Sequence, residues 1–181
     1  MMKILVVVDM QNDFIDGSLK NPETKAIVGN IVNKIKAHED KGNFILVTRD
    51  THYDDYLQTQ EGKKLPVPHC IINTLGWDIN DQIKNALKDH ENVVYIDKNT
   101  FGSINLADFI KEKGEAHPEE KIEVEMVGVC TDICVVSNAL ITKAFLPEVE
   151  ITVDSSCCAG ITPESHEAAL TTMKMCQINI I

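Results

Sequence analysis

Six short apolar runs recur along the chain, separated by segments of mixed polarity. The first run, residues 4–8, is apolar at every position. An unbroken run is typical of a strand buried on both faces, because a half-exposed strand alternates apolar and polar positions. We therefore predict that residues 4–8 form a central strand of a parallel sheet. The other predicted strands cover residues 44–47, 93–96, 124–129, 151–153 and, from a weaker run, 178–181.

Segments with a helical spacing of apolar positions lie between these runs. The predicted helices cover residues 24–41, 79–88, 105–113, 132–145 and 163–175. Alternation of strands and helices predicts an α/β fold: an open six-stranded parallel sheet of order 3-2-1-4-5-6 with helices on both faces, a Rossmann-like three-layer sandwich. Neither an internal repeat nor a low-complexity linker divides the sequence, so we expect a single domain over residues 1–181.

Composition narrows the possible partners. The 181 residues carry 17 basic and 28 acidic side chains, which gives a net charge of −11. Such a charge repels nucleic acids and anionic membrane surfaces, so neither is expected as a partner. The apolar run at residues 4–8 is too short for a signal peptide or a membrane span. Six cysteines, two of them adjacent, suit a reducing compartment, and a cytoplasmic location is expected.

Residues that can carry chemistry stand where the predicted strands end. In open α/β sheets, ligands bind beyond the carboxyl ends of the strands. Asp9 follows the first predicted strand, Lys98 follows the third, and Cys134 lies shortly after the fourth. The first strand is not followed by a glycine-rich turn, since the first glycine of the chain is Gly17. We therefore expect no nucleotide cofactor.

Cys134 is the candidate nucleophile. It falls in the first turn of the predicted helix 132–145, where the helix dipole and unpaired backbone N–H groups lower the pKa of a thiol. Those N–H groups could also bind the oxyanion that forms when a carbonyl is attacked. Asp9 would be the base if the first and fourth strands are neighbours, and Lys98 would favour both charged forms. The alternatives are a packing cysteine, a turn-capping aspartate and a solvated lysine.

Asp50, His52 and His69 are candidate metal ligands. Asp50 and His52 are two positions apart, so in extended backbone their side chains point to the same side. His69 follows in a proline-containing loop. One carboxylate and two imidazoles suit a divalent metal with positions left open for water or substrate. Because Asp and His are ordinary loop residues, the pattern by itself does not favour a metal over a plain loop.

Three segments resemble the motifs of a known family. Residues 8–14, Val-Asp-Met-Gln-Asn-Asp-Phe, resemble the opening motif of the isochorismatase-like cysteine hydrolases. Residues 128–135, Gly-Val-Cys-Thr-Asp-Ile-Cys-Val, resemble their nucleophile motif, and Lys98 with the following Phe101-Gly102-Ser103 resembles the segment of their central lysine. The resemblance runs over nearly the whole chain in matching order.

This resemblance implies roles for four residues. Asp9, Lys98 and Cys134 would form an Asp-Lys-Cys triad. A cis peptide bond would precede Cys130, and the backbone N–H groups of Cys130 and Cys134 would form the oxyanion hole.

The candidate metal ligands point to one group of enzymes within this family. Asp50, His52 and His69 resemble the metal site of the nicotinamidases of this family, in which the ion is thought to orient the pyridine ring. The resemblance implies a divalent ion, with zinc expected and manganese or iron as alternatives. Phe14 and Phe101 are the candidate aromatic walls of the substrate pocket.

The activity implied by the resemblance is that of a cysteine amidohydrolase converting nicotinamide to nicotinate and ammonia through a thioester. The nearest alternative is an amidase of the same family that acts on a ureido or carbamoyl compound. A non-catalytic α/β ligand-binding protein and a thiol redox protein are alternatives from other classes. Family members often associate, so we expect a homo-oligomer with a small-molecule amide as its substrate.

Overall fold

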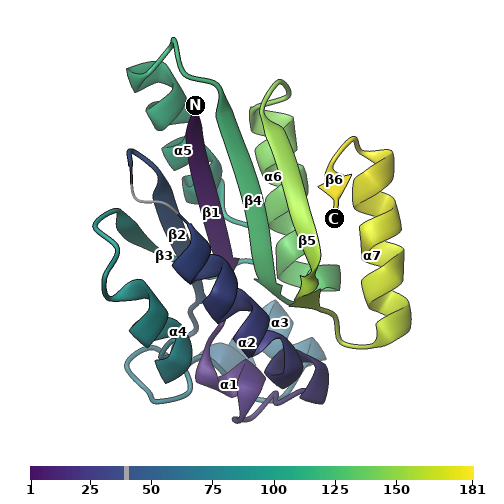
Figure 1. The fold of residues 1–181 in the computed structure, drawn as a ribbon. Coiled ribbons are helices and arrows are strands. Elements are labelled where there is room, and N and C mark those ends of the chain that lie inside the picture. Colours follow the sequence, from purple (N-terminus) through teal and green to yellow (C-terminus); the bar gives the residue numbers. More distant parts are fainter. Residues whose placement is uncertain (39–40) are drawn as a thin grey trace.

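A six-stranded parallel sheet organises the computed structural model, which describes residues 1–38 and 41–181 (Figure 1). The strand order is β3-β2-β1-β4-β5-β6, so the predicted order and the α/β fold are confirmed. The strands are β1 Met2–Val8, β2 Phe44–Asp50, β3 Val93–Lys98, β4 Ile122–Val129, β5 Glu150–Ala159 and β6 Asn179–Ile180.

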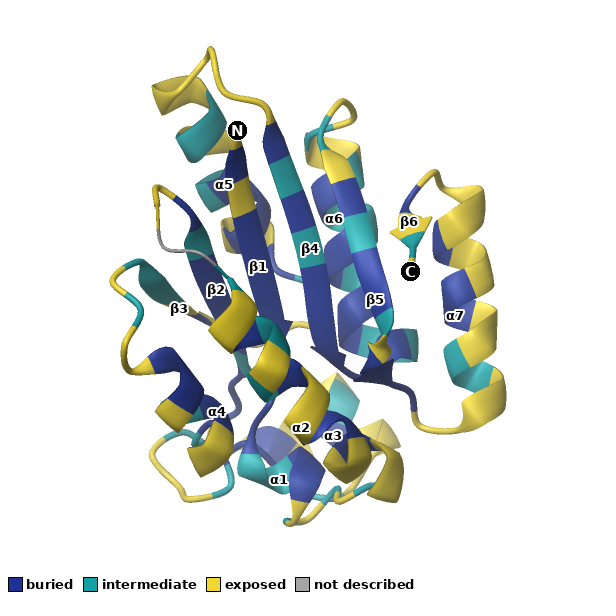
Figure 2. Cartoon of the chain, viewed as in Figure 1, coloured by how far each residue is buried: buried dark blue, intermediate teal, exposed yellow. Residues whose placement is uncertain are grey.

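β1 lies in the middle of the sheet and is buried on both faces, as its unbroken apolar run predicts. It pairs in parallel with β2 up to Val8 and Thr48, and with β4 up to Val8 and Gly128. Figure 2 shows β1 and β4 buried over most of their lengths. Because the strands are parallel, the carboxyl ends of β1, β2 and β4 reach the same edge of the sheet.

Helices cover both faces of the sheet (Figure 1), which confirms the three-layer arrangement. α1, α2 and α4 contribute to the core on one face, and α5, α6 and α7 to the core on the other. No helix in the described ranges is long and apolar enough to cross a membrane. The helices are α1 Asn12–Ile15, α2 Pro22–Ala37, α3 Gln60–Lys64, α4 Asp81–Leu87, α5 Ile104–Ala116, α6 Val136–Phe145 and α7 Pro163–Met175.

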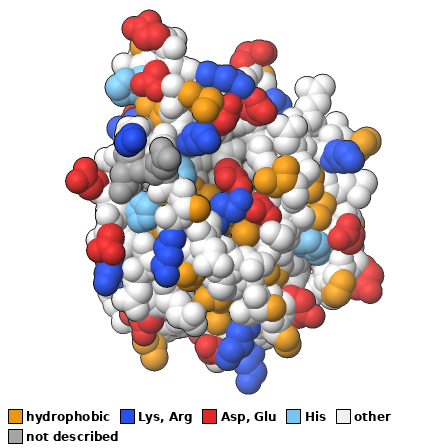
Figure 3. All heavy atoms as spheres, viewed as in Figure 1, with side chains coloured by type: hydrophobic (Ala, Val, Ile, Leu, Met, Phe, Trp, Pro, Cys, Tyr) orange, Lys and Arg blue, Asp and Glu red, His pale blue; other side chains and the backbone are white. Residues whose placement is uncertain are grey.

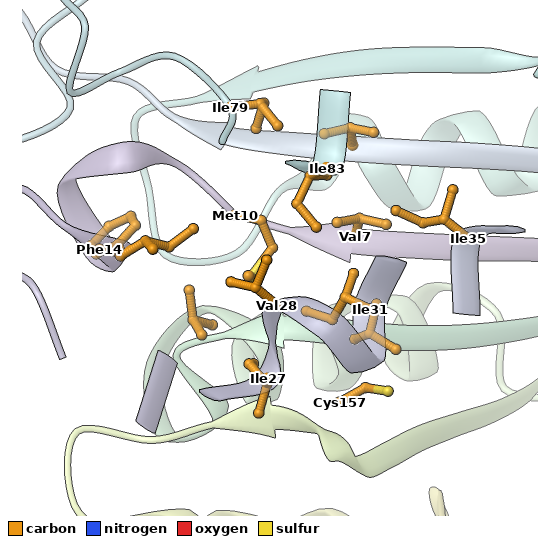
Figure 4. Packing of buried hydrophobic residues seen from close by; sticks show 14 of the residues in the cluster. Val7, Met10, Phe14, Ile27, Val28, Ile31, Ile35, Ile79, Ile83 and Cys157 are labelled. Carbon is orange, nitrogen blue, oxygen red and sulfur yellow. The ribbon is translucent and has the colours of Figure 1, made fainter. Parts of the chain in front are cut away.

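α2 illustrates how the sequence forms these layers. Ile27, Ile31 and Ile35 recur at intervals of four residues, and all three are buried. Figure 4 shows them in the same cluster as Val7 of β1. Burial of each isoleucine contributes roughly 1.5–3 kcal/mol. The helix begins where the Asn21 side chain accepts a hydrogen bond of 3.0 Å from a backbone N–H of the first turn.

Lys34 of α2 makes ion pairs with two strands of the sheet. Lys34 Nζ lies 2.7 Å from a carboxylate oxygen of Glu125 and 2.6 Å from one of Asp154. Acidic and basic side chains are interspersed on the face that α2 covers (Figure 3). These pairs connect α2 to β4 and β5 at the rim of the apolar core.

Several helix boundaries differ from the predictions. α2 ends at Ala37 rather than at residue 41, because His38 is already extended, and residues 39 and 40 of the predicted helix lie outside the described residues. α5 continues to Ala116, where the following proline disfavours further helix. The predicted helix 132–145 is divided into a π-helical turn, η2 Thr131–Val135, and α6.

Three short elements escaped the sequence analysis. They are α1, α3 and a 3-10 turn, η1 Tyr56–Gln58, which precedes α3. Each has five residues or fewer. A segment of that length does not complete two helical turns, so it shows no apolar period.

β1 and β4 approach each other very closely at their carboxyl ends. Gly128 has a φ of 117°, and a Cβ atom added there would overlap the carbonyl oxygen of Val8. Only glycine permits both this φ and this distance. Directly after Val8, Asp9 turns away from the sheet with a φ of 50°. The segment after β1 is thereby placed beside the segment after β4.

Gly128→Ala tests this close approach. We expect it to lower the free energy of unfolding by about 2–4 kcal/mol, because the new Cβ clashes with β1 and the backbone conformation is strained. Urea unfolding measures the change. Gly29→Ala is the matched control: nothing lies within 4 Å of a Cβ added there, in the middle of α2, so it should stabilise by about 0.5–1 kcal/mol. Equal effects of the two substitutions would contradict the role of Gly128.

Candidate functional site

Asp9, Lys98 and Cys134 meet at the carboxyl edge of the sheet. Asp9 follows β1, Lys98 ends β3, and Cys134 lies in η2, after β4. Lys98 Nζ is 2.7 Å from Asp9 Oδ2 and 3.6 Å from Cys134 Sγ. All three residues are buried. The structure thus brings the three predicted triad residues together, with the ammonium beside both the carboxylate and the thiol.

Asp9 is fixed at the end of β1 by Thr48 of β2. The backbone N–H of Asp9 donates to the carbonyl oxygen of Thr48 at 3.2 Å. The Thr48 hydroxyl donates to Asp9 Oδ1 at 2.6 Å. One carboxylate oxygen is therefore held by a hydroxyl, while Oδ2 faces Lys98.

The segment that carries Cys134 is held by its neighbours. It begins with a cis peptide bond before Cys130, as the family resemblance implied. Asn138 of α6 donates from Nδ2 to the carbonyl oxygen of Cys134 at 2.9 Å. The Thr131 hydroxyl lies 2.8 Å from Nδ1 of His166 in α7. These contacts fix the backbone whose N–H groups, at Cys130 and Cys134, were predicted to bind an oxyanion.

The environment of Cys134 favours the neutral thiol. Burial raises the pKa of Cys134 well above its ordinary value, and the charge of Asp9 adds to this rise although Lys98 opposes it. The prediction that the helix N-terminus lowers this pKa is therefore wrong, because desolvation outweighs the dipole in a buried site. The thiol needs a base to become a nucleophile.

Asp9 and Lys98 have shifted pKa values that suit them to this task. Burial raises the pKa of Asp9 above its ordinary value, while Lys98 works in the opposite direction. Burial alone would lower the pKa of Lys98, but the nearby acidic groups, Asp9 first among them, raise it. Lys98 therefore stays charged, and a proton can move between Asp9 and Cys134, both of which have raised pKa values.

Asp50, His52 and His69 gather beside these residues. One ligand atom of each lies within 4.8 Å of those of the other two. Asp50 Oδ2 is 3.0 Å from His52 Nε2 and 3.4 Å from His69 Nε2. His69 Nδ1 lies 2.8 Å from the carbonyl oxygen of Val67, and donation to this oxygen leaves Nε2 free to bind an ion. The three side chains fit a divalent metal such as zinc.

Glu61 is a further potential ligand that the sequence analysis missed. Its Oε1 lies 3.6 Å from His52 Nε2 and 3.8 Å from His69 Nε2. Glu61 lies in the short helix α3, which begins where the Thr59 hydroxyl accepts a hydrogen bond from the Gly62 N–H at 3.0 Å. A threonine followed by helix-forming residues is a start signal, but the helix it begins is too short for an apolar period to support it.

The charge of Asp50 depends on its neighbours. Burial pushes the pKa of Asp50 upward, but hydrogen bonds with His52 and His69 and the charge of Lys98 hold it below its ordinary value. For His69, burial acts to lower the pKa, because it disfavours the charged imidazolium. The hydrogen bond with Asp50 outweighs this effect and raises the pKa of His69 above its ordinary value. A metal ion at this position would replace the proton that the imidazole and carboxylate share.

A cavity of about 950 Å³ opens beside both groups of residues. Asp50, His69 and Cys134 line it, so thiol and candidate metal ligands face the same space. Phe14 and Phe101, the two predicted aromatic walls, also line the cavity. Phe14 packs edge-on against the ring of His69, with centroids 5.9 Å apart. Further apolar lining comes from Leu19, Leu65, Ile133 and Ile161.

The fold and the site together define a class: a parallel α/β protein with a buried cysteine, acid and lysine beside a carboxylate and two imidazoles. The Isochorismatase domain model matches residues 3–181. The chain therefore belongs to the isochorismatase family, and the predicted family is confirmed.

Known relatives and structures are similar over almost the whole chain. The isochorismatase family protein PncA of Bacillus subtilis (strain 168) is 30% identical over 177 residues, covering 94% of this chain and 93% of that protein. The crystal structure of nicotinamidase PncA from Bacillus subtilis matches with a TM-score of 0.83 at 27% identity and covers 99% of both chains. The zinc complex of the Pyrococcus horikoshii pyrazinamidase matches with a TM-score of 0.79 at 28% identity, covering 99% of this chain and 98% of that one.

His69→Gln tests the candidate metal site. We expect the chelator-treated protein to bind Zn²⁺, and the substitution to weaken binding by at least about 100-fold, because it removes one of the three ligands. Isothermal titration calorimetry measures the affinity. The control is His117→Gln, an exposed histidine at the end of α5, which should bind Zn²⁺ like the wild type. Equal affinity of both variants would exclude His69 as a ligand.

Proposed function

We propose that this protein is a cysteine amidohydrolase that converts nicotinamide to nicotinate and ammonia. The observation that carries the proposal is the position of the Lys98 ammonium, 2.7 Å from the Asp9 carboxylate and 3.6 Å from the Cys134 sulfur, beside the cavity that Cys134 lines. The similar structure of a nicotinamidase at 27% identity over 99% of both chains supports this substrate.

The first half of the proposed reaction forms a thioester. Asp9 accepts the proton of the Cys134 thiol, and the resulting thiolate attacks the carboxamide carbon. The backbone N–H groups of Cys130 and Cys134 stabilise the oxyanion. Asp9 then transfers its proton to the leaving nitrogen, the C–N bond breaks, and ammonia departs.

The second half releases the acid. Asp9, again a carboxylate, takes a proton from a water molecule that attacks the thioester. The C–S bond breaks, Asp9 returns its proton to the Cys134 sulfur, and nicotinic acid leaves and loses its carboxyl proton to solvent as nicotinate. Lys98 keeps its charge through both halves, since its pKa lies above the ordinary value for lysine. Its role is to favour the ionised forms of Asp9 and Cys134.

Asp50, His52 and His69, with Glu61 close by, would hold a divalent metal ion. Zinc is the preferred ion, with manganese and iron as alternatives, because the donor set is one or two carboxylates and two imidazoles. When bound, the ion supplies an electrophilic position that can attract the nitrogen of a pyridine ring and orient it. The zinc complex of the similar pyrazinamidase structure supports a metal here.

Phe14 and Phe101 are proposed to contact the substrate ring. Both line the cavity, and Phe14 packs against the imidazole of His69. An aromatic ring in the cavity would bury apolar surface against these side chains. Cys134 lines the same cavity, so the proposed ring site and the nucleophile share one space.

Ammonia release tests the reaction. We expect the purified protein to produce ammonia and nicotinate from nicotinamide, and Cys134→Ala to reduce the rate by at least about 1,000-fold, since no other group replaces the nucleophile. Cys176→Ala is the matched control, because this cysteine is exposed near the carboxyl terminus, and its activity should equal that of the wild type.

Other outcomes identify the alternatives. Turnover of ureido or carbamoyl amides without turnover of nicotinamide would favour a different amidase of the family. Turnover that survives Cys134→Ala would disprove the thioester route. A protein that binds amides and hydrolyses none of them would be a ligand-binding module.

The dependence of the rate on pH tests the role of Asp9. Only its ionised form accepts the Cys134 proton, and its pKa is raised, so kcat/KM should rise with pH through an apparent pKa above the ordinary value of 3.8. Because the pKa values of Cys134 and Lys98 are raised, we expect kcat/KM not to fall again until the pH exceeds about 9.

Lys98→Met sharpens this test. Loss of the ammonium removes the group that lowers the pKa of Asp9, so the rise should move to higher pH. We expect kcat/KM at neutral pH to fall by at least about 100-fold. If the rise of kcat/KM with pH stays at the same pH in this variant, the rise reports the ionisation of a group other than Asp9.

A further inference from the structure

The side chain of Gln11 forms hydrogen bonds with both backbone groups of Asp50. Gln11 Nε2 donates to the carbonyl oxygen of Asp50 at 2.8 Å, and Gln11 Oε1 accepts from the Asp50 N–H at 2.7 Å. Nε2 also donates to the carbonyl oxygen of Trp77 at 2.8 Å. Gln11 has no exposed surface. Its carboxamide therefore uses both of its donor hydrogens and its oxygen on backbone groups.

The strand geometry at Asp50 explains why these two backbone groups are available to Gln11. In a parallel sheet, the N–H and C=O of one residue point toward the same neighbouring strand, and those of the next residue point the other way. Thr51 donates its N–H to the backbone of β3 at 2.7 Å, so the N–H and C=O of Asp50 point toward β1. β1 pairs with β2 only as far as Thr48. The single Gln11 carboxamide thus satisfies both backbone groups of Asp50, which two successive peptide groups of a longer β1 would otherwise bond.

Few side chains can make this contact. Asparagine and glutamine alone carry a carboxamide, in which an uncharged donor and acceptor are attached to the same planar carbon, as in a peptide. A glutamate in the same place would turn a carboxylate oxygen toward the carbonyls of Asp50 and Trp77. Methionine would leave the buried N–H and C=O of Asp50 without the partners they have now.

We propose that Gln11 is a positioning residue for the Asp50 carboxylate, and through it for the metal ion. The inference rests on the metal site of the proposed function. With its backbone held at both N–H and C=O, Asp50 presents Oδ2 at 3.0 Å and 3.4 Å from the Nε2 atoms of His52 and His69. Gln11 does not itself touch substrate or metal.

Metal affinity is the readout, because a purely structural role would not change it in a folded variant. We expect Gln11→Glu to weaken Co²⁺ binding by about 10–100-fold, measured by visible absorption of the bound ion and by calorimetry. Asn12→Asp is the matched control: it makes the same amide-to-carboxylate change one residue along and breaks the hydrogen bond from Nδ2 to the Leu75 carbonyl, 2.8 Å long and away from Asp50. Its Co²⁺ affinity should equal that of the wild type.

Gln11→Met repeats the test without a buried charge, and thermal unfolding of each metal-free variant shows that it is folded. Equal Co²⁺ affinity in the wild type and the folded Gln11 variants would overturn the inference and leave the metal site intact. An equal loss in Asn12→Asp would also overturn it, since any loosening of the segment would then suffice. If neither Gln11 variant folds, the Gln11 carboxamide is needed for folding itself, and the inference of a positioning role is overturned. A wild type that binds no Co²⁺ would refute the metal site itself.

Discussion

The buried ion pair between Lys98 and Asp9 is the interaction on which the rest of the site depends. Removing two charges from water costs several kcal/mol per ion, and only close, well-partnered geometry offsets this. Here the 2.7 Å pair, the Thr48 hydroxyl on Asp9 and Asp50 at 3.8 Å from Lys98 provide it. The same low dielectric that makes the pair expensive raises the pKa of the Cys134 thiol. Burial therefore raises the pKa values of both the acid and the thiol, which suits the proton transfer proposed for them.

The strand order decides which residues can take part in this pair. β1 and β4 are neighbours, so the segments that follow them, with Asp9 and Cys134, lie side by side. β3 is separated from β1 by β2, and only a long side chain can reach Asp9 from its end. Lys98 spans that distance from a position in register with Asp50 on β2. The Lys98 side chain therefore extends past Asp50 to reach Asp9. This explains why its ammonium lies near both the candidate metal ligand Asp50 and the proposed triad residue Asp9.

Much of this arrangement could be read from the sequence, because burial on both faces makes an apolar run unbroken and strand ends in a parallel sheet share an edge. The positions of Asp9, Lys98 and Cys134 followed from that rule and from the motif resemblance. The pKa of Cys134 did not, because the depth of burial depends on packing from both faces. Glu61 escaped because α3 is too short to show a period. The catalytic roles, the single domain, the homo-oligomer and the cytoplasmic location stay predictions.

The segment after β1 determines more of the site than its one predicted residue. Asp9 pairs with Lys98 in the proposed triad, Gln11 holds the backbone of Asp50, and Asp13 Oδ2 accepts the backbone N–H of Cys70, directly beside His69, at 2.7 Å. Alternate side chains of one short segment thus supply the proposed base for the thiol and hold the backbone on both sides of the candidate metal site. A substrate held between an ion and a nucleophile needs a fixed distance between the two. A single segment bonded to both can set that distance more rigidly than independent loops could, which gives residues 8–14 a physical reason for their composition.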